Sequence, residues 1–132
     1  MKGFKAGIER DAIKNKNFRK VLYTSKHLQL VLMSLKGGED IGEETHLEND
    51  QFFRFEKGTG KCMIDGNIYK VKDGDVLIVP AGAKHNIINA DKKKELKMYT
   101  LYAPPHHKDG IIRPAKEDAE KHGAVFDGVT TE

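Results

Sequence analysis

The chain has 132 residues, of which 38% are apolar and 33% are charged, and its net charge is +3. This length fits a single domain with a compact core, and no apolar run approaches the ~20 residues that a membrane-spanning helix needs. Lys and Arg are scattered among Asp and Glu, so we expect neither a nucleic-acid partner nor a membrane partner.

Two features predict a cytoplasmic protein. The first residues, MKGFKA, lack the hydrophobic stretch of a secretory signal. The single cysteine, Cys62, excludes an intramolecular disulfide and fits a reducing compartment. The one basic run, residues 92–94, is interpreted as a solvated hairpin tip rather than a binding patch.

Residues 1–17 form a polar N-terminal arm, in which residues 8–13 either make a short helical turn or pack as an extended segment. From residue 18 the pattern changes to short strands separated by glycine-containing turns, which is typical of an all-β sandwich or barrel. We predict strands at 18–24, 27–35, 51–56, 61–64, 68–71, 76–79, 84–90 and 96–103. The barrel therefore covers residues 18–103.

Turn chemistry supports several of these boundaries. Asp65-Gly66 is the preferred pair for a type I′ hairpin, because both residues need positive φ. Residues 76–79 are continuously apolar, which predicts a strand buried on both faces, and Pro80 ends it. After Pro104-Pro105 the strands are expected to stop.

Residues 104–132 form a C-terminal extension with one short helix at 114–122. Pro114 is expected in its first turn and Gly123 just past its end. The tail from Ala124 is expected to be loosely held.

Strand alternation is expected to place several polar side chains at one point of the barrel. Glu44 and His46 are two residues apart and so point the same way in an extended segment. Gln51 begins the next strand, with Phe53 and Phe55 on its face. The opposite face, which is expected to meet water or a partner subunit, carries Phe52, Arg54 and Glu56.

A fourth polar side chain, His85, follows the turn at Pro80-Ala81-Gly82. Together with Glu44, His46 and Gln51 it makes a set of two nitrogens and two oxygens. That set suits Fe²⁺, Mn²⁺, Ni²⁺, Co²⁺ or Zn²⁺ and is too rich in nitrogen for Ca²⁺ or Mg²⁺. With one carboxylate, the loaded site would carry a charge of about +1 and favour an anionic substrate oxygen.

At these residues the sequence resembles the small single-domain cupins. The second cupin motif is matched throughout by Gly74, Pro80-Ala81-Gly82, His85 and Asn89. The first motif is matched by Gly38, Glu44-Thr45-His46, Gln51 and Gly58, with two departures. Glu44 stands where the first histidine is usual, and Gln51 stands where the glutamate is usual. The carboxylate has therefore moved rather than vanished.

The resemblance implies a jelly-roll barrel, the cupin double-stranded β-helix, with Glu44, His46, Gln51 and His85 as metal ligands. It also implies a homodimer and a pocket walled by inward-facing residues. The candidate wall residues are Phe53, Phe55, Ile87, Asn89, Met98 and Tyr102. Tyr102 is the candidate for handling a proton or orienting a substrate, since a phenol both donates and accepts. His106 and His107 are expected at the barrel mouth.

Three functions compete. The first is a metal-dependent isomerase or lyase acting on a sugar or keto acid, which the Gln ligand favours by similarity to sugar-processing cupins. The second is a non-haem Fe(II) dioxygenase, since two histidines and one carboxylate are its donor set. The third is a cupin that binds a small ligand without turnover.

Overall fold

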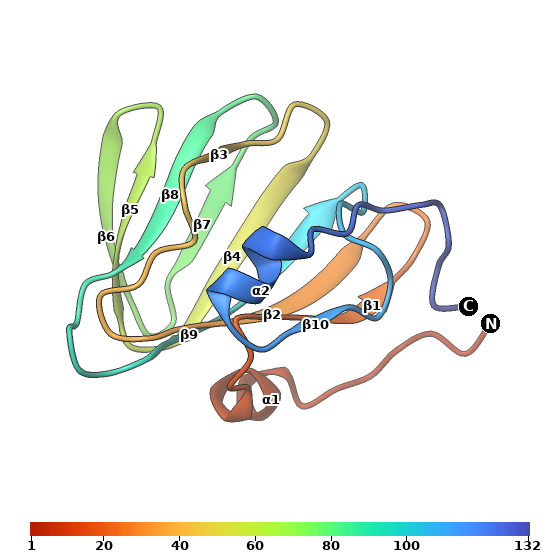
Figure 1. The fold of residues 1–132 in the computed structure, drawn as a ribbon, viewed down its shortest axis with the longest axis horizontal. Helices are drawn as coiled ribbons and strands as arrows, with labels where there is room; N and C mark the ends of the chain where they lie inside the picture. The colour runs from red at the N-terminus through yellow and green to blue at the C-terminus, as the bar shows by residue number, and fades with distance from the viewer.

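The chain folds into two antiparallel sheets that form a barrel (Figure 1). One short helix precedes the first strand, and another follows the last strand. The computed structural model describes residues 1–132. The strands are β1 Arg19–Thr24, β2 Gln29–Leu35, β3 Glu44–Thr45, β4 Asp50–Lys57, β5 Thr59–Ile64, β6 Asn67–Lys72, β7 Val76–Val79, β8 Lys84–Asn89, β9 Leu96–Ala103 and β10 Ile112–Arg113. The helices are α1 Ile8–Lys14 and α2 Lys116–Lys121. The predicted all-β jelly roll with a short C-terminal helix is confirmed.

One sheet has the order β10-β1-β2-β9-β4-β7, and the other has the order β3-β8-β5-β6. Their inner faces share one hydrophobic core of 16 residues, which includes Met33 and Phe55 from the first sheet and Cys62 and Ile87 from the second. The β5–β6 hairpin closes as predicted, with φ of 46° at Asp65 and 81° at Gly66.

The prediction that residues 76–79 form a strand buried on both faces is wrong. β7 lies at the edge of the six-stranded sheet and pairs only with β4. Leu77 and Val79 point into the core, whereas Val76 and Ile78 are 46% and 62% exposed. A continuous apolar run does not distinguish a central strand from an edge strand whose outer face is itself apolar.

Two predictions for the C-terminal extension are also wrong. The strands do not stop at Pro105, because β10 pairs with β1. The tail is not loosely held: the Phe126 amide donates to the His106 carbonyl, and the Thr131 amide donates to the Thr24 carbonyl. These partners lie far apart in sequence, so no local pattern predicts the pairing.

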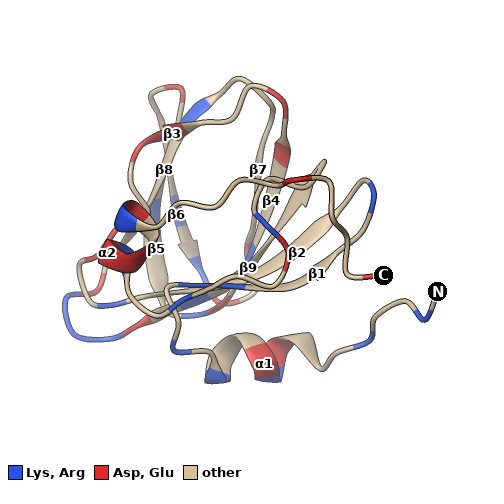
Figure 2. Ribbon diagram, turned by 45° about the vertical axis from the view of Figure 1, so that its right-hand side comes forward, with Lys and Arg blue, Asp and Glu red and all other residues tan.

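Both helices pack outside the barrel, and both are far too short to cross a membrane. The helical alternative for the N-terminal arm is the correct one, and Ala12 of α1 is fully buried. Pro114 lies before α2 rather than in its first turn, where Asp118 instead accepts the Ala115 amide at 2.9 Å. Figure 2 shows acidic and basic residues interspersed on both helices and along the strands.

Candidate metal centre

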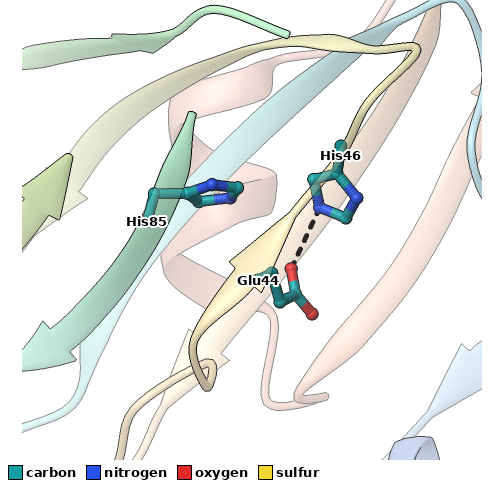
Figure 3. Close-up of side chains that lie close together, drawn as sticks. All are labelled: Glu44, His46 and His85. Carbon is teal, nitrogen blue, oxygen red and sulfur yellow. Dashed lines mark hydrogen bonds and ion pairs between the residues drawn. The ribbon is translucent and has the colours of Figure 1, made fainter. Parts of the chain in front are cut away.

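Three of the four predicted ligands lie together at the β3 edge of the four-stranded sheet. β3 pairs with β8 so that Glu44 lies directly opposite His85, and His46 follows β3 by one residue. One ligand atom from each of the three lies within 4.8 Å of the other two (Figure 3). Small side-chain movements would let one ion with bonds of ~2 Å reach all three.

The hydrogen bonds of His85 prepare its ring for a metal. Its Nδ1 lies 3.0 Å from the Ala83 carbonyl oxygen, which only a protonated Nδ1 can contact favourably. Its Nε2 is buried and has no hydrogen-bond partner. The lone pair of Nε2 is therefore free to bind a cation, and a backbone carbonyl that fixes the ring through the other nitrogen is a usual feature of metal-binding histidines.

Gln51 presents a second buried acceptor without a partner. Its side chain is 2% exposed, its Nε2 donates to Thr100 Oγ1 at 3.0 Å, and its Oε1 has no partner. Gln51 pairs directly with Tyr102 across β4 and β9, and the Tyr102 ring lies 5.7 Å from the His46 ring. The amide oxygen is thus a buried acceptor without a partner, and it is of a type that binds divalent metals.

The electrostatics of the cluster favour an ionised carboxylate. Burial acts to raise the pKa of Glu44, but the hydrogen bond and charge of His46, with smaller contributions from Arg19 and His85, lower it below its ordinary value. Glu44 Oε2 lies 3.0 Å from His46 Nε2. A divalent ion would therefore compete only with a proton that these two groups share.

Aromatic and imidazole rings pack against the cluster. The His106 ring is 4.3 Å from the His46 ring, and burial with the nearby His46 lowers the pKa of His106 to about 4. Tyr102 is buried, its hydroxyl lies 3.2 Å from His107 Nε2, and burial raises its pKa well above the ordinary value. The phenol therefore stays protonated at neutral pH.

The other predicted wall residues have structural surroundings. Phe53, Phe55, Ile87 and Met98 all belong to the hydrophobic core. Asn89 donates from Nδ2 to the carbonyls of Leu35, Lys36 and Lys94, and its Oδ1 accepts the Asp91 amide. Its side chain is fully engaged in anchoring loops, which leaves no free donor for a ligand.

Sequence reasoning missed Arg19, whose charge also acts on Tyr102, His106 and His107. Arg19 is buried at the start of β1. A signal was present in the alternation of β1, because Arg19 shares a face with Val21, which faces the core.

Comparisons with known proteins agree with this architecture. Residues 31–102 match the Cupin_2 family model, described as a cupin domain. The uncharacterized protein YrkC of Bacillus subtilis (strain 168) is 42% identical over 127 residues, which cover 89% of this chain and 66% of YrkC. The uncharacterized protein L612 of Acanthamoeba polyphaga mimivirus is 43% identical over 108 residues, covering 80% of this chain and 68% of L612. The chain thus spans just under two thirds of the length of YrkC.

The crystal structure of BH2720 from Bacillus halodurans superposes with a TM-score of 0.89 at 37% identity, covering 92% of this chain and 96% of that chain. The family match covers more than half of the residues described here, and the superposition extends over almost the whole fold. The chain belongs to the cupin family.

Proposed function

We propose that this chain is a metal-binding cupin enzyme in which Glu44, His46, Gln51 and His85 hold a divalent transition metal. The observation that carries the proposal is the pair of buried, unpartnered acceptors, His85 Nε2 and Gln51 Oε1. Leaving such atoms unpaired costs stability, and a cation near the Glu44–His46 pair would satisfy both. Mn²⁺, Fe²⁺, Co²⁺, Ni²⁺ and Zn²⁺ all accept this donor set.

We further propose an isomerase or lyase reaction on a sugar or keto acid. When bound, the metal would supply a Lewis acid that polarises a carbonyl oxygen. The chain itself supplies surroundings that exclude water, with His106 beside His46 and the buried core residues Phe53 and Ile87. Tyr102 is suited to donate a hydrogen bond to a substrate oxygen, since its hydroxyl is buried beside His107 and stays protonated at neutral pH.

A second function is favoured by the composition of the clustered trio. Glu44, His46 and His85 are two histidines and one carboxylate, the donor set of non-haem Fe(II) dioxygenases. The two reactions differ in a measurable way, because only the oxygenase consumes O₂. A cupin that binds a small ligand without turnover is the third alternative.

Metal content tests the site directly. Elemental analysis of purified protein should give roughly one transition-metal ion per chain, and the variant His46→Ala His85→Ala should fall to background. His27→Ala is the matched control, because His27 is exposed on the loop before β2. Wild-type protein that takes up none of the five metals after loading would eliminate the proposed centre and leave the ligand-binding module.

Turnover is tested next with metal-loaded protein and a panel of small sugars and keto acids in D₂O. Proton NMR should show exchange or shift of hydrogen at the carbon beside the carbonyl, with no O₂ uptake at an electrode. O₂ consumption that requires Fe²⁺ and a substrate would establish the dioxygenase instead. Loss of either signal in His46→Ala His85→Ala ties the chemistry to the centre.

A further inference from the structure

A small cavity opens beside the candidate metal centre, between the first strand, the last strand and the C-terminal tail. It has a volume of about 140 Å³, and its polar lining consists of Arg19, Arg113, His106, His107 and His122. No acidic residue lines it. His106 also contacts the ring of His46, so one wall of the cavity is shared with the centre.

Arg19 is a buried cation without a counterion. Arg19 is only 8% exposed, and its Nε has no hydrogen-bond partner. Arg19 takes part in none of the ion pairs of the chain. Its guanidinium lies 5.3 Å from the ring of Phe18, and the charge of Glu44 attracts it without forming an ion pair. An anion that enters the cavity would give this guanidinium a hydrogen-bonded partner that the chain itself does not provide.

The strand register adds a second positive charge at the same place. Arg19 on β1 lies directly opposite Arg113 on β10. Like charges at directly opposed positions destabilise a sheet. Arg113 is nevertheless held in place, because its Nε donates to the His122 carbonyl at 2.8 Å and its Nη1 donates to the Ile112 carbonyl at 3.1 Å. The fold therefore keeps two guanidinium groups around a cavity without acids.

We propose that Arg19, assisted by Arg113, binds a carboxylate group of a small organic acid in this cavity. A guanidinium matches a carboxylate through two parallel hydrogen bonds, and the cavity admits only a small molecule. Where the proposed metal function holds, on which this extension rests, the substrate is a hydroxy or keto acid. Its carboxylate binds Arg19 while its other oxygen lies toward His106 and the centre.

The binding test uses the full chain and sodium pyruvate, sodium acetate and inorganic phosphate as probes, at constant ionic strength with chloride as reference. The Nε–H signal of Arg19 in ¹H–¹⁵N NMR should shift with pyruvate and saturate. Calorimetric affinity for pyruvate should fall at least about tenfold in Arg19→Met and less in Arg19→Lys, which keeps the charge but not the fork. Arg10→Met, an exposed arginine on α1, is the matched control and should bind like wild type.

Folding of the key variant is checked by its melting temperature. Arg19→Met should melt at or above the wild-type temperature without ligand, because it removes an unpaired buried charge. A lower melting temperature would mean that Arg19 is already paired in the free protein and would overturn the inference. An Arg19-dependent site that prefers phosphate to both carboxylates would also overturn it.

Metal-free and metal-loaded protein are compared to separate this inference from the proposed centre. Arg19→Met should keep the metal content of wild type while losing pyruvate. Pyruvate binding that survives in Arg19→Met but disappears in His46→Ala His85→Ala would place the anion on the metal and refute the Arg19 site. Arg19-dependent binding in protein that takes up no metal would refute the centre and leave the anion site standing.

Discussion

Gln51 decides the charge of the proposed metal centre. The Gln51 amide is neutral, so Glu44 provides the one carboxylate among the four proposed ligands. The Oε1 atom of Gln51 is buried and has no hydrogen-bond partner. Gln51→Glu adds a second negative charge at the same distance from the backbone, and we expect affinity for divalent metals to rise by about tenfold or more. Gln51→Leu keeps the bulk but removes the oxygen, and affinity should fall by a similar factor.

Competition with a chromophoric chelator measures both affinities at neutral pH. The two variants have nearly the same size, so a packing effect would move them together, whereas ligation moves them in opposite directions. Equal affinities in Gln51→Glu, Gln51→Leu and wild type would remove Gln51 from the ligand set and reduce the centre to three residues.

His107 links stability to pH through its burial. Burial, followed by the charge of Arg19, lowers the pKa of His107 to about 2 from the ordinary value of 6.5. Below pH 6.5 the unfolded chain takes up a proton that the folded chain excludes, so the free energy of unfolding falls as the pH falls. The slope from this one group is at most about 1.4 kcal/mol per pH unit between pH 6.5 and the range where the protein unfolds.

Urea unfolding at a series of pH values, with chelator present, measures this slope. His107→Asn removes the titrating group, so its stability should depend less steeply on pH below 6.5, whatever its absolute stability. His27→Asn, at an exposed position, should keep the wild-type slope. Parallel pH profiles for wild type and His107→Asn would show that the burial of His107 does not control acid stability.

At the scale of the element, two turn glycines separate backbone strain from steric clash. Gly58, between β4 and β5, has φ of +104°, and a Cβ there would lie 2.7 Å from the Glu95 carbonyl oxygen. Gly66 in the β5–β6 hairpin has φ of +81°, but a Cβ there would meet nothing within 4 Å. Gly66→Ala should therefore cost about 1 kcal/mol from positive φ alone.

Gly58→Ala carries the same strain and adds a clash with the Glu95 backbone, which cannot move away as a side chain could. It should lower the free energy of unfolding by at least about 3 kcal/mol. Chemical denaturation of both variants gives the comparison. Equal losses would mean that the 95–96 segment yields to the new methyl group. Gly58 closes the first cupin motif, so its place in that pattern has a physical reason in the close approach of β9.

The elements that the sequence predicted well are those with local signals. The Asp65-Gly66 turn, the alternation of Gln51, Phe53 and Phe55, and the Pro80-Ala81-Gly82 turn before His85 all depend on neighbouring residues. Local spacing places Glu44 and His46 close together, and the pairing of β3 with β8 brings His85 to them. Gln51 as a ligand, and the catalytic role of Tyr102, stay predictions.

The elements that sequence reasoning missed depend on distant partners. β10 is two residues long and exists because β1 offers an unpaired edge. The tail is held by hydrogen bonds to the backbone carbonyls of Thr24 and His106. Every residue has a backbone carbonyl, so the sequence does not indicate which ones the tail will contact. Arg19 was overlooked because a charged residue in an alternating strand is ordinarily assigned to the surface. Its burial follows from the cover that the C-terminal segment places over this end of the barrel.

At the scale of the whole molecule, the outer face of the six-stranded sheet carries a row of apolar side chains. One cross-strand row runs Ile78, Phe52, Leu101, Leu30 in register from β7 to β2. Ile78 is 62% exposed, and the other three are half-buried. α1 contacts this sheet, yet it leaves the β7 end open (Figure 1). Contiguous exposed apolar surface of this kind is typical of an interface.

We propose that a second copy of the chain covers this row, giving the homodimer that the sequence led us to expect. A two-fold axis makes each copy bury the same row against its partner, so one apolar patch is enough.

Ile78→Asp would place a carboxylate in that contact and should weaken association at least 100-fold, equivalent to about 3 kcal/mol. Ile68→Asp, 57% exposed on β6 of the other sheet, is the matched control and should associate like wild type. Sedimentation velocity over a range of concentrations distinguishes the three proteins. A wild-type chain that remains monomeric at high concentration, or a dimer that Ile78→Asp leaves intact, would exclude this face as the interface, because an apolar contact cannot absorb a buried, unpaired carboxylate.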